Sequence, residues 1–334
     1  MPSGTRRQIR SALDDRPMTQ PPTNSIEVRV PATTANLGAG FDCLGLALEL
    51  YLNVRATVLS KPGARTLARS RGIRGSSLLP TAPEQNLILR AMRHTAEKEG
   101  MSLPPVRLAV QNQIPMASGL GSSAAATIAG VALAFAVTSR AVPRETALRH
   151  AAEIEGHADN VGAALFGGLV VTMPRSDGSV VAVQKRWPKM IRITAVTPIL
   201  TLETKKSRAV LPDTVPLRDA VHNLQRSTLF VAAVEERRYD LIWDAMQDRL
   251  HQTHRQRLIP GLSDVLAMPR IPGLLGLALS GAGPSVVALT MDRHAEIGNA
   301  IAAHFERHGL ASTIWNLEAA QEGLAVTEKR SRQR

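Results

Sequence analysis

The sequence predicts an α+β protein of two domains, and three observations support this class. The chain of 334 residues, with 44% hydrophobic content, is long enough to bury two modest cores. Stretches with the period-2 alternation of strands are interspersed with stretches of helical periodicity in both halves. The basic segment Lys-Arg-Trp-Pro-Lys at residues 185–189 separates the two halves and is the candidate boundary. Mixed strands and helices in two halves favour an α+β fold.

We expect four regions along the chain. Residues 26–185 form the first domain and residues 186–320 the second. Residues 1–25 are rich in Pro, Ser, Thr and Arg without apolar periodicity, which predicts a disordered tail. A cleaved targeting peptide is the alternative, but this segment contains two aspartates and no apolar core. Residues 321–334 end in a cluster of Lys and Arg and are expected to be a basic tail.

Local periodicity predicts the elements of the first domain in order. Alternating apolar residues predict strands at 26–30 and 48–58, and the Gly, Pro, Ser and Arg of residues 61–83 predict a loop. The later elements are a helix at 86–99, a strand at 106–110, helices at 124–137 and 144–154, and a hairpin of 167–173 with 180–184.

The second domain follows the same reasoning. The expected elements are a strand at 191–196, helices at 217–236, 239–252 and 293–307, and an extended segment at 312–316.

Composition limits the classes of function. A formal charge of +12 suits nucleic acid or an anionic substrate such as ATP. Only three Trp, two Tyr and five Phe are present, so stacking platforms for single strands are scarce. No apolar run approaches the roughly 20 residues that span a bilayer, which predicts no membrane partner. The single cysteine, Cys43, excludes an internal disulfide and fits the reducing cytoplasm.

The run Ile-Pro-Met-Ala-Ser-Gly-Leu-Gly-Ser-Ser-Ala-Ala-Ala at residues 114–126 is the strongest functional signal. Its two glycines permit positive φ, and a helix should begin at the two serines. The free N–H groups and the macrodipole of that first turn form an anion site. An ordinary Gly-Ser turn with an N-cap is the alternative. The chain contains no Gly-Lys-Ser or Gly-Lys-Thr, which excludes a Walker loop. The residues expected to bind ATP are Pro115, Met116, Ala117, Ser118, Gly119, Leu120, Gly121, Ser122, Ser123, Ala124 and Ala125.

Two further motifs surround this run in the sequence. Pro-Ala-Thr-Thr-Ala-Asn-Leu-Gly-Ala-Gly-Phe-Asp begins at Pro31 and contains Asn36 and Asp42. An Asx turn, in which these side chains bond to their own backbone, is the alternative to a ligand site. Leu-Ser-Gly-Ala-Gly-Pro-Ser-Val at residues 279–286 is the third motif, for which a glycine turn between two strands is the alternative.

A fourth segment, Glu-Ile-Glu-Gly-His-Ala-Asp-Asn at residues 153–160, concentrates ionisable side chains. The sequence has no His-Glu-x-x-His, which excludes that metalloprotease class. A lone histidine among small residues is more often structural than catalytic. Any single arginine among forty basic residues is more often a surface charge than a ligand.

Together these motifs resemble the GHMP kinase superfamily, and within it the homoserine kinases, from about residue 26 to about residue 317. The resemblance implies an N-terminal domain like the second domain of ribosomal protein S5 and a ferredoxin-like C-terminal domain, with ATP and substrate at their junction. It also implies a homodimer that phosphorylates L-homoserine with ATP and Mg²⁺ in threonine biosynthesis.

The resemblance also assigns roles to individual residues. Glu155 and Ser123 would hold Mg²⁺, and Asp42 would hold the substrate ammonium with Asn36 beside it. Asn160 stands where the mevalonate branch has an aspartate base. Because an amide cannot accept a proton at neutral pH, transfer would depend on positioning and charge neutralisation. The implied catalytic residues are Asn160, His157 and Ser123. The implied substrate-binding residues are Asn36, Asp42, Asn160, Thr204, Arg208, Arg255, Gly281 and Gly283.

The sequence departs from the family pattern before Arg255. His-Gln-Thr-His-Arg at residues 251–255 stands where homoserine kinases commonly have His-Glu-Pro-Tyr-Arg, so the alignment at Arg255 is weaker than at Arg208. Planar guanidinium groups suit a carboxylate, which is the role implied for both arginines. His251 and His254 have a spacing that suits a metal on a helix, but no third ligand accompanies them.

Two alternative functions remain open. Another GHMP-type kinase is the first, although the mevalonate branch is disfavoured by Asn160. The Pro-Ala-Thr-Thr-Ala-Asn opening also disfavours the diphosphocytidyl-methylerythritol kinases, which begin Pro-Ala-Lys-x-Asn. The second alternative, from another class, is a basic nucleic-acid-binding protein with an S5-like fold, although we expect no nucleic-acid partner.

Overall fold

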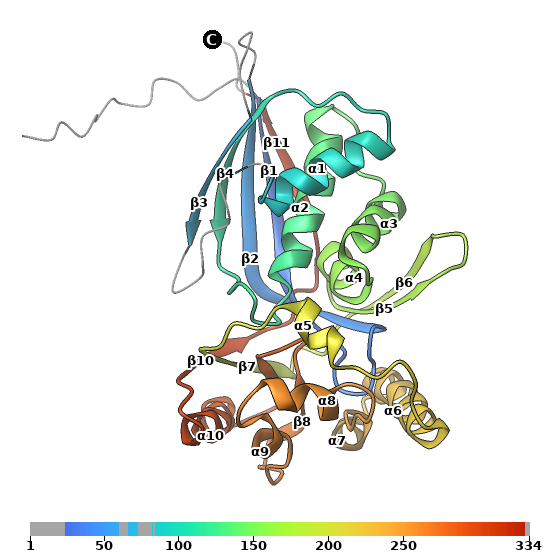
Figure 1. Ribbon diagram of the computed structural model, residues 1–334, viewed down its shortest axis with the longest axis vertical. Coiled ribbons are helices and arrows are strands. Elements are labelled where there is room, and N and C mark those ends of the chain that lie inside the picture. The colour runs from blue at the N-terminus through green and yellow to red at the C-terminus, as the bar shows by residue number, and fades with distance from the viewer. Residues whose placement is uncertain (1–23, 60–65, 73–81, 83, 331–334) are drawn as a thin grey trace, which may run out of the picture.

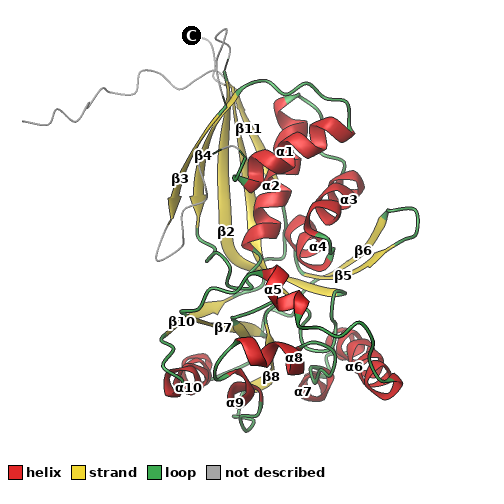
Figure 2. Ribbon diagram, in the orientation of Figure 1, coloured by secondary structure: helices red, strands yellow, loops and turns green. Residues whose placement is uncertain are grey.

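The strands of the chain form two sheets, each with helices packed against it (Figures 1 and 2). The computed structural model describes residues 24–59, 66–72, 82 and 84–330. The predicted α+β class is confirmed. Within the described ranges, every helix is too short or too polar to cross a membrane.

The larger sheet has the order β11-β1-β2-β4-β3, and β5 pairs with β2 and with β6. Its strands are β1 (Asn24–Ala35), β2 (Leu44–Val58), β3 (Leu67–Gly72), β4 (Val106–Asn112), β5 (Leu169–Pro174), β6 (Val180–Lys185) and β11 (Ala325–Arg330). The long strand β2 pairs with β1 over most of its length, its second half also pairs with β4, and its first residues also pair with β5. The first motif therefore lies where β1 ends and β2 begins.

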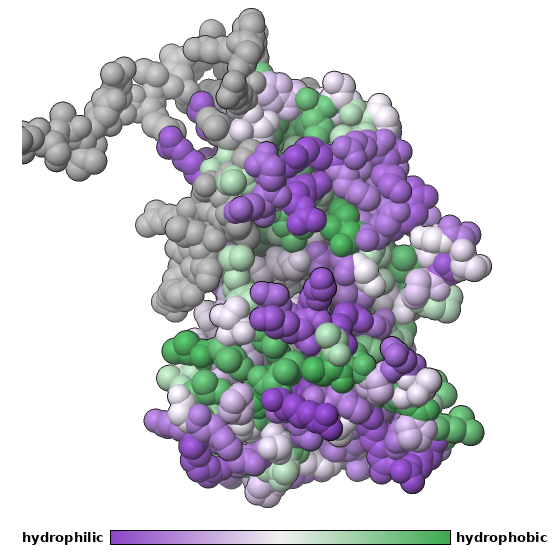
Figure 3. Space-filling view, viewed as in Figure 1, coloured by the Kyte–Doolittle hydropathy of each residue, from purple (hydrophilic) through white to green (hydrophobic). Residues whose placement is uncertain are grey.

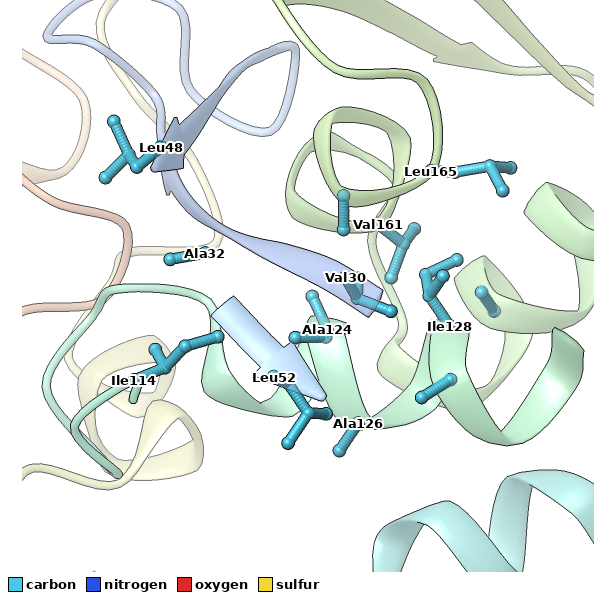
Figure 4. Packing of buried hydrophobic residues seen from close by; sticks show 14 of the residues in the cluster. Val30, Ala32, Leu48, Leu52, Ile114, Ala124, Ala126, Ile128, Val161 and Leu165 are labelled. Carbon is cyan, nitrogen blue, oxygen red and sulfur yellow. The ribbon is translucent and has the colours of Figure 1, made fainter. Parts of the chain in front are cut away.

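Four helices cover one face of this sheet (Figure 1). They are α1 (Leu87–Lys98), α2 (Ser122–Val137), α3 (Arg144–Glu155) and α4 (Asp159–Phe166). The central helix is α2, whose residues 124–137 are all buried. A helix that is apolar all round has to be enclosed, and the sheet, α1, α3 and α4 surround it. Figure 4 shows Ala124 and Ile128 of α2 packed near Val30 and Val161. A side chain at Gly130 would collide with the backbone of α1, so the two helices approach closely there.

The smaller sheet is antiparallel with the order β10-β7-β9-β8. Its strands are β7 (Arg192–Pro198), β8 (Leu274–Leu279), β9 (Val286–Thr290) and β10 (Ser312–Leu317). The accompanying helices are α5 (Thr204–Ala209), α6 (Leu217–Glu235), α7 (Ile242–Ala245), α8 (Gln252–Arg255), α9 (Leu262–Leu266) and α10 (His294–Arg307), with 3₁₀ helices η1 (Tyr239–Leu241) and η2 (Gln256–Leu258). Ile297, Ile301 and Phe305 recur every four residues along α10 and are buried in the core of this half.

The continuous helix predicted for residues 239–252 is wrong. The segment is divided into η1 and α7, and a turn then leads into α8. The side chain of Asp248 explains the break, because its carboxylate accepts hydrogen bonds from the N–H groups of Leu250, His251 and Gln252 at 3.0, 3.0 and 2.8 Å. An aspartate that binds backbone N–H groups in this way starts a new helix and does not continue the old one.

Two segments that were predicted to be irregular contain strands. Residues 67–72 lie in the predicted loop but form β3, which pairs in parallel with β4. Residues 325–330 lie in the predicted basic tail but form β11, which pairs with β1. Among the described residues both strands lie at the edges of the sheet, where natural proteins commonly place charged side chains. Residues 1–23 of the predicted N-terminal tail lie outside the described residues, and Asn24 and Ser25 begin β1.

Residues 185–189, the candidate boundary, lie where the chain passes from the larger sheet to the smaller one. The last strand before this segment, β6, belongs to the larger sheet, and the next strand, β7, belongs to the smaller one. The chain then returns to the larger sheet at β11. The division at residues 185 and 186 into two domains stays a prediction.

Candidate active site

The glycine-rich run at residues 114–126, called the phosphate loop from here on, requires its two glycines for its backbone conformation. Gly119 and Gly121 have φ of +84° and +72°, in the left-handed region that glycine tolerates best. A side chain on Gly119 would collide with the carbonyl oxygen of Ser280, and one on Gly121 would collide with the hydroxyl of Thr33. The loop is therefore pressed between the first and third motifs, and α2 begins directly after it at Ser122.

Hydrogen bonds join the three motifs at this point. The N–H of Thr33 donates to the carbonyl of Leu120 at 3.2 Å. The hydroxyl of Ser280 donates to the carbonyl of Gly119 at 2.7 Å. The carbonyls of Gly119 and Leu120 are thus bound to the third and first motifs. The N–H groups of the first turn of α2 follow directly after the loop. This is the arrangement that binds an anion at a helix N-terminus.

The three motifs and the segment at the end of α3 line one open cleft. The predicted site residues that line it are Asn36, Asp42, Ala117, Ser118, Gly119, Gly121, Ser122, Ser123, Ala124, Glu155, His157, Asn160, Thr204, Arg208, Arg255 and Gly281.

Five predicted site residues are not among those that line the cleft. They are Pro115, Met116, Leu120, Ala125 and Gly283. Leu120 and Ala125 are fully buried, and the carbonyl of Gly283 lies close beneath Gly119. That these five residues contact the ligands stays a prediction.

A group of oxygen atoms stands at the start of α2. The carboxylate of Glu155 accepts hydrogen bonds from the hydroxyls of Ser123 at 2.8 Å and Thr127 at 2.6 Å. Thr127 lies one turn after Ser123 on α2, so both hydroxyls face the end of α3. A carboxylate and a hydroxyl are the hard oxygen donors that Mg²⁺ prefers, and the pair therefore fits this ion.

His157, Asp159 and Asn160 form a connected polar group beside these oxygens. Nδ1 of His157 lies 2.7 Å from the carboxylate of the buried Asp159. Burial lowers the pKa of His157, but the hydrogen bond and charge of Asp159 outweigh it, and the net pKa is raised. The amide oxygen of Asn160 accepts a hydrogen bond from the hydroxyl of Thr33 at 2.7 Å. This bond fixes the orientation of the amide, whose NH₂ group donates one hydrogen bond to Oδ1 of Asp159 at 3.3 Å and keeps its second N–H.

Across the cleft, Asp42 and Arg208 form a bidentate ion pair. The two guanidinium N–H groups donate to the two carboxylate oxygens at 3.0 and 2.6 Å. This hydrogen bond raises the pKa of Arg208 further above its already high value. Asn36 holds the loop that carries Asp42, because its side chain accepts from the N–H of Asp42 at 3.1 Å and donates to the carbonyl of Gly281 at 3.1 Å.

Arg255 reaches the same region from α8 and is almost completely buried. It donates to the carbonyl of Gly281 at 2.9 Å and to Nδ1 of His251 at 3.2 Å. Burial, and then the nearby charge of Arg208, lower the pKa of Arg255 to about 10. His251 in turn donates to the carbonyl of Gly38 at 2.9 Å, and burial lowers its pKa. Both nitrogens of His251 are thus used inside the protein, which leaves no role for it in a metal pair with His254.

Comparison with known proteins gives the family. The description "GHMP kinases N terminal domain" matches residues 86–168. A protein named homoserine kinase from Deinococcus radiodurans is 41% identical over 312 residues, which cover 91% of this chain and 98% of that one. The chain belongs to the homoserine kinase family. The homoserine kinase of Desulfitobacterium hafniense is 38% identical, over 90% of this chain and 99% of its own. The crystal structure of homoserine kinase from Cytophaga hutchinsonii superposes with a TM-score of 0.78 at 31% identity and covers 91% of this chain and 97% of that one.

The GHMP kinase fold expected from the sequence is therefore confirmed for this homoserine kinase family member, and its division into two domains stays a prediction. Three polar residues were missed at the level of the sequence: Asp159, which lines the cleft, and the buried Thr33 and Thr127, which bond to the cleft residues Asn160 and Glu155. Thr33 and Asp159 stand inside motifs that had been recognised, and the polarity of Thr127 in an otherwise apolar helix is the signal that could have identified it.

Proposed function

We propose that the chain transfers the γ-phosphate of ATP to the hydroxyl of L-homoserine, which gives ADP and O-phospho-L-homoserine in threonine biosynthesis. One observation carries the proposal. A helix N-terminus suited to phosphate and an Asp–Arg pair suited to an amino acid zwitterion line the same cleft. The names of relatives that match nearly from end to end agree with this reaction.

The nucleotide phosphates would lie against residues 119–124. The N–H groups of the first turn of α2 supply hydrogen bonds and partial positive charge there. Ser123 and Glu155 would hold Mg²⁺, which when bound neutralises charge on the transferred phosphate. Thr127 donates to the same carboxylate of Glu155 and so fixes its orientation.

The substrate would lie at the other end of the cleft. Its ammonium would pair with Asp42, and its carboxylate with Arg208 and Arg255. Both arginines reach the cleft wall, and Thr204 lies beside them at the start of α5. Asp42 and Arg208 already pair with each other, so a zwitterion could enter between them and satisfy both charges.

The transfer step needs the substrate hydroxyl in line with the γ-phosphate. We assign this positioning to Asn160, because Thr33 fixes its amide and its NH₂ group can donate to the hydroxyl oxygen. The hydroxyl oxygen forms a bond to phosphorus as the bond to the bridging oxygen breaks, and that electron pair stays on ADP. The hydroxyl proton passes to an oxygen of the transferred group. His157 holds Asp159, which accepts from the N–H of Asn160 at 2.7 Å, so both residues position Asn160.

A coupled ADP-release assay with purified protein and a panel of amino alcohols, mevalonate and sugars tests the proposal. L-homoserine should give the highest kcat/KM, and ³¹P NMR should identify a phosphate monoester at its hydroxyl. Equal or better turnover of mevalonate or a sugar would favour another GHMP-type activity. Omission of Mg²⁺ should abolish turnover.

Two parts of the proposal concern the whole molecule. We propose a homodimer, as the family resemblance suggests, and light scattering of the purified chain would measure its mass. We also propose a cytoplasmic location, where ATP is supplied, and fractionation of the source cells would test it.

A further inference from the structure

Three potential metal ligands meet between α1 and α3, outside the cleft. They are His94 on α1 and His150 and Glu153 on α3, and one ligand atom from each lies within 4.8 Å of the others. Nε2 of His94 lies 3.1 Å from Oε2 of Glu153. Nδ1 of His150 lies 3.8 Å from the same oxygen.

His150 gives an independent reason to expect a ligand. Its side chain is only 2% exposed, and its buried Nδ1 has no hydrogen-bond partner among the described residues. Its other nitrogen, Nε2, lies 2.7 Å from a carboxylate oxygen of Glu99. Because Nε2–H donates to that carboxylate, Nδ1 carries a lone pair and is directed at the cluster. A buried polar atom without a partner is destabilising, and a bound cation would remove that cost.

We propose that His94, His150 and Glu153 bind one Zn²⁺ ion that joins α1 to α3. Two imidazoles and one carboxylate are a donor set that zinc accepts, with a water at the fourth position. Ligand atoms about 2.0–2.1 Å from a tetrahedral zinc are roughly 3.3 Å apart, close to the separations of 3.1 and 3.8 Å in this cluster. Glu99 orients His150 as a carboxylate commonly orients a zinc-bound histidine.

The surroundings permit both the ligand geometry and the fourth position. Lys98 donates to Oε1 of Glu153 at 2.8 Å and leaves Oε2 for the metal. The side chains of His94 and Glu153 are 30% and 46% exposed, so water can complete the coordination. Figure 3 shows that the surface over α1 and α3 is largely hydrophilic.

This site is distinct from the one assigned to Mg²⁺. Glu153 and Glu155 are two positions apart on α3, and residues at that spacing point to nearly opposite sides of a helix. Glu153 faces α1, whereas Glu155 faces Ser123 at the start of α2. Imidazole donors also select zinc over Mg²⁺. The zinc would stabilise the packing of two helices that both support α2.

Metal binding is measured directly on the full chain, freed of any affinity tag and treated with a chelator. Titration with Co²⁺ should produce the visible absorption of a tetrahedral site at one ion per chain, and Zn²⁺ should displace it. At a hundredfold excess over Kd, Zn²⁺ should raise the melting temperature by roughly 5 °C. The absence of both signals in the parent protein would overturn the proposal.

The variants His94→Ala and Glu153→Gln locate the site without opening the core. Each should lose the Co²⁺ absorption and the Zn²⁺-dependent shift in melting temperature. Glu99→Gln should weaken Zn²⁺ binding about 10- to 100-fold without abolishing it. His308→Ala is the matched control, because His308 is an exposed histidine that pairs with Asp264 at 2.8 Å and should bind no zinc. If the first two variants bind zinc as tightly as the parent, the assignment is wrong.

Discussion

The carboxylate of Asp42 and the guanidinium of Arg208 satisfy each other across the cleft through two hydrogen bonds of 2.6 and 3.0 Å. The motifs assign these two residues to opposite charges of the substrate. Their pairing means that the cleft holds balanced charges before any zwitterion enters. A bound amino acid therefore has to replace one ion pair by two, and it gains affinity only if both of its charged groups are present.

Arg208→Ala should raise the KM for L-homoserine far more than the KM for ATP. A hydrogen bond between charged groups contributes about 1.5–3 kcal/mol, so the rise should be roughly 10- to 150-fold. Initial rates at saturating ATP and at saturating homoserine measure the two KM values. Arg238→Ala is the matched control, because Arg238 makes a similar bidentate pair with the exposed Asp240. A rise confined to the KM for ATP would place Arg208 at the nucleotide instead.

Ser123→Ala should lower kcat strongly while the fold persists. Its hydroxyl stands at the start of α2 and bonds to Glu155, where charge develops during transfer. Loss of one preorganised contact of this kind costs about 3 kcal/mol, on the order of a hundredfold in kcat. Ser179→Ala is the control, because Ser179 also donates to a carboxylate, that of Asp177, but on an exposed turn. A kcat within twofold of the parent, at saturating Mg²⁺ and ATP, would remove Ser123 from the catalytic site.

The sequence predicts correctly those helices and strands whose pattern of apolar residues fits only one type of secondary structure. The run of small apolar residues in α2 and the period of α10 predict those helices to within two residues at each end. The edge strands β3 and β11 were missed because they carry too few apolar residues for a clear alternation. The break at Asp248 was missed because its cause is a set of hydrogen bonds that form only after the chain has turned.

The same distinction applies to the site. The glycine-rich motifs locate the cleft because positive φ and close backbone approach leave a signature in residue type. The residues that form hydrogen bonds or ion pairs with these motifs leave no such signature in the sequence. Thr33 and Asn160 are 127 positions apart, and the bond between them depends on how β1 meets α4. The Asp42–Arg208 pair likewise follows only from the tertiary fold.

Asp248→Asn should destabilise the protein in a pH-dependent way. Burial raises the pKa of Asp248, but the hydrogen bonds that its carboxylate accepts from Asn223 and from backbone N–H groups lower it, and the net pKa is lowered from its ordinary value. The folded state thus binds fewer protons than the unfolded state. The stabilisation is complete above the ordinary pKa and is lost as the pH falls through the folded value.

Urea denaturation at several pH values measures this difference. At pH 7 the variant should be about 2 kcal/mol less stable, because a carboxylate that binds several N–H groups has been replaced. The difference in the free energy of unfolding between the parent and Asp248→Asn should decrease as the pH falls below about 4. Asp240→Asn, at an exposed carboxylate, should show no such gap at any pH. A gap for Asp248→Asn that stays constant down to acid pH would mean that the charge is not responsible.

Truncation after Leu324 should lower the melting temperature. The deletion removes β11, whose residues pair with Asn24 to Arg29 of β1, and it exposes the backbone groups of that edge. A loss of about 2 kcal/mol would correspond to roughly 3 °C for a chain of this length. Scanning calorimetry measures the shift, and removal of residues 331–334 alone is the control. If both truncations melt like the parent, the β11–β1 pairing adds nothing to stability.

The parent protein should reject 4-hydroxybutyrate, which has the carboxylate and hydroxyl of homoserine but lacks its ammonium. With this analogue in the cleft, Arg208 would turn to the substrate carboxylate, and Asp42 would lose the one ion-pair partner that it has among the described residues. A site built on such bonds discriminates by about 10⁴ in kcat/KM, because its own charged group stays unpaired. In Asp42→Asn that unpaired charge is absent, so the ratio should fall by at least tenfold, mainly through slower turnover of homoserine. Comparable kcat/KM values for the two compounds in the parent would mean that Asp42 does not bind an ammonium, and the homoserine assignment would fail with it.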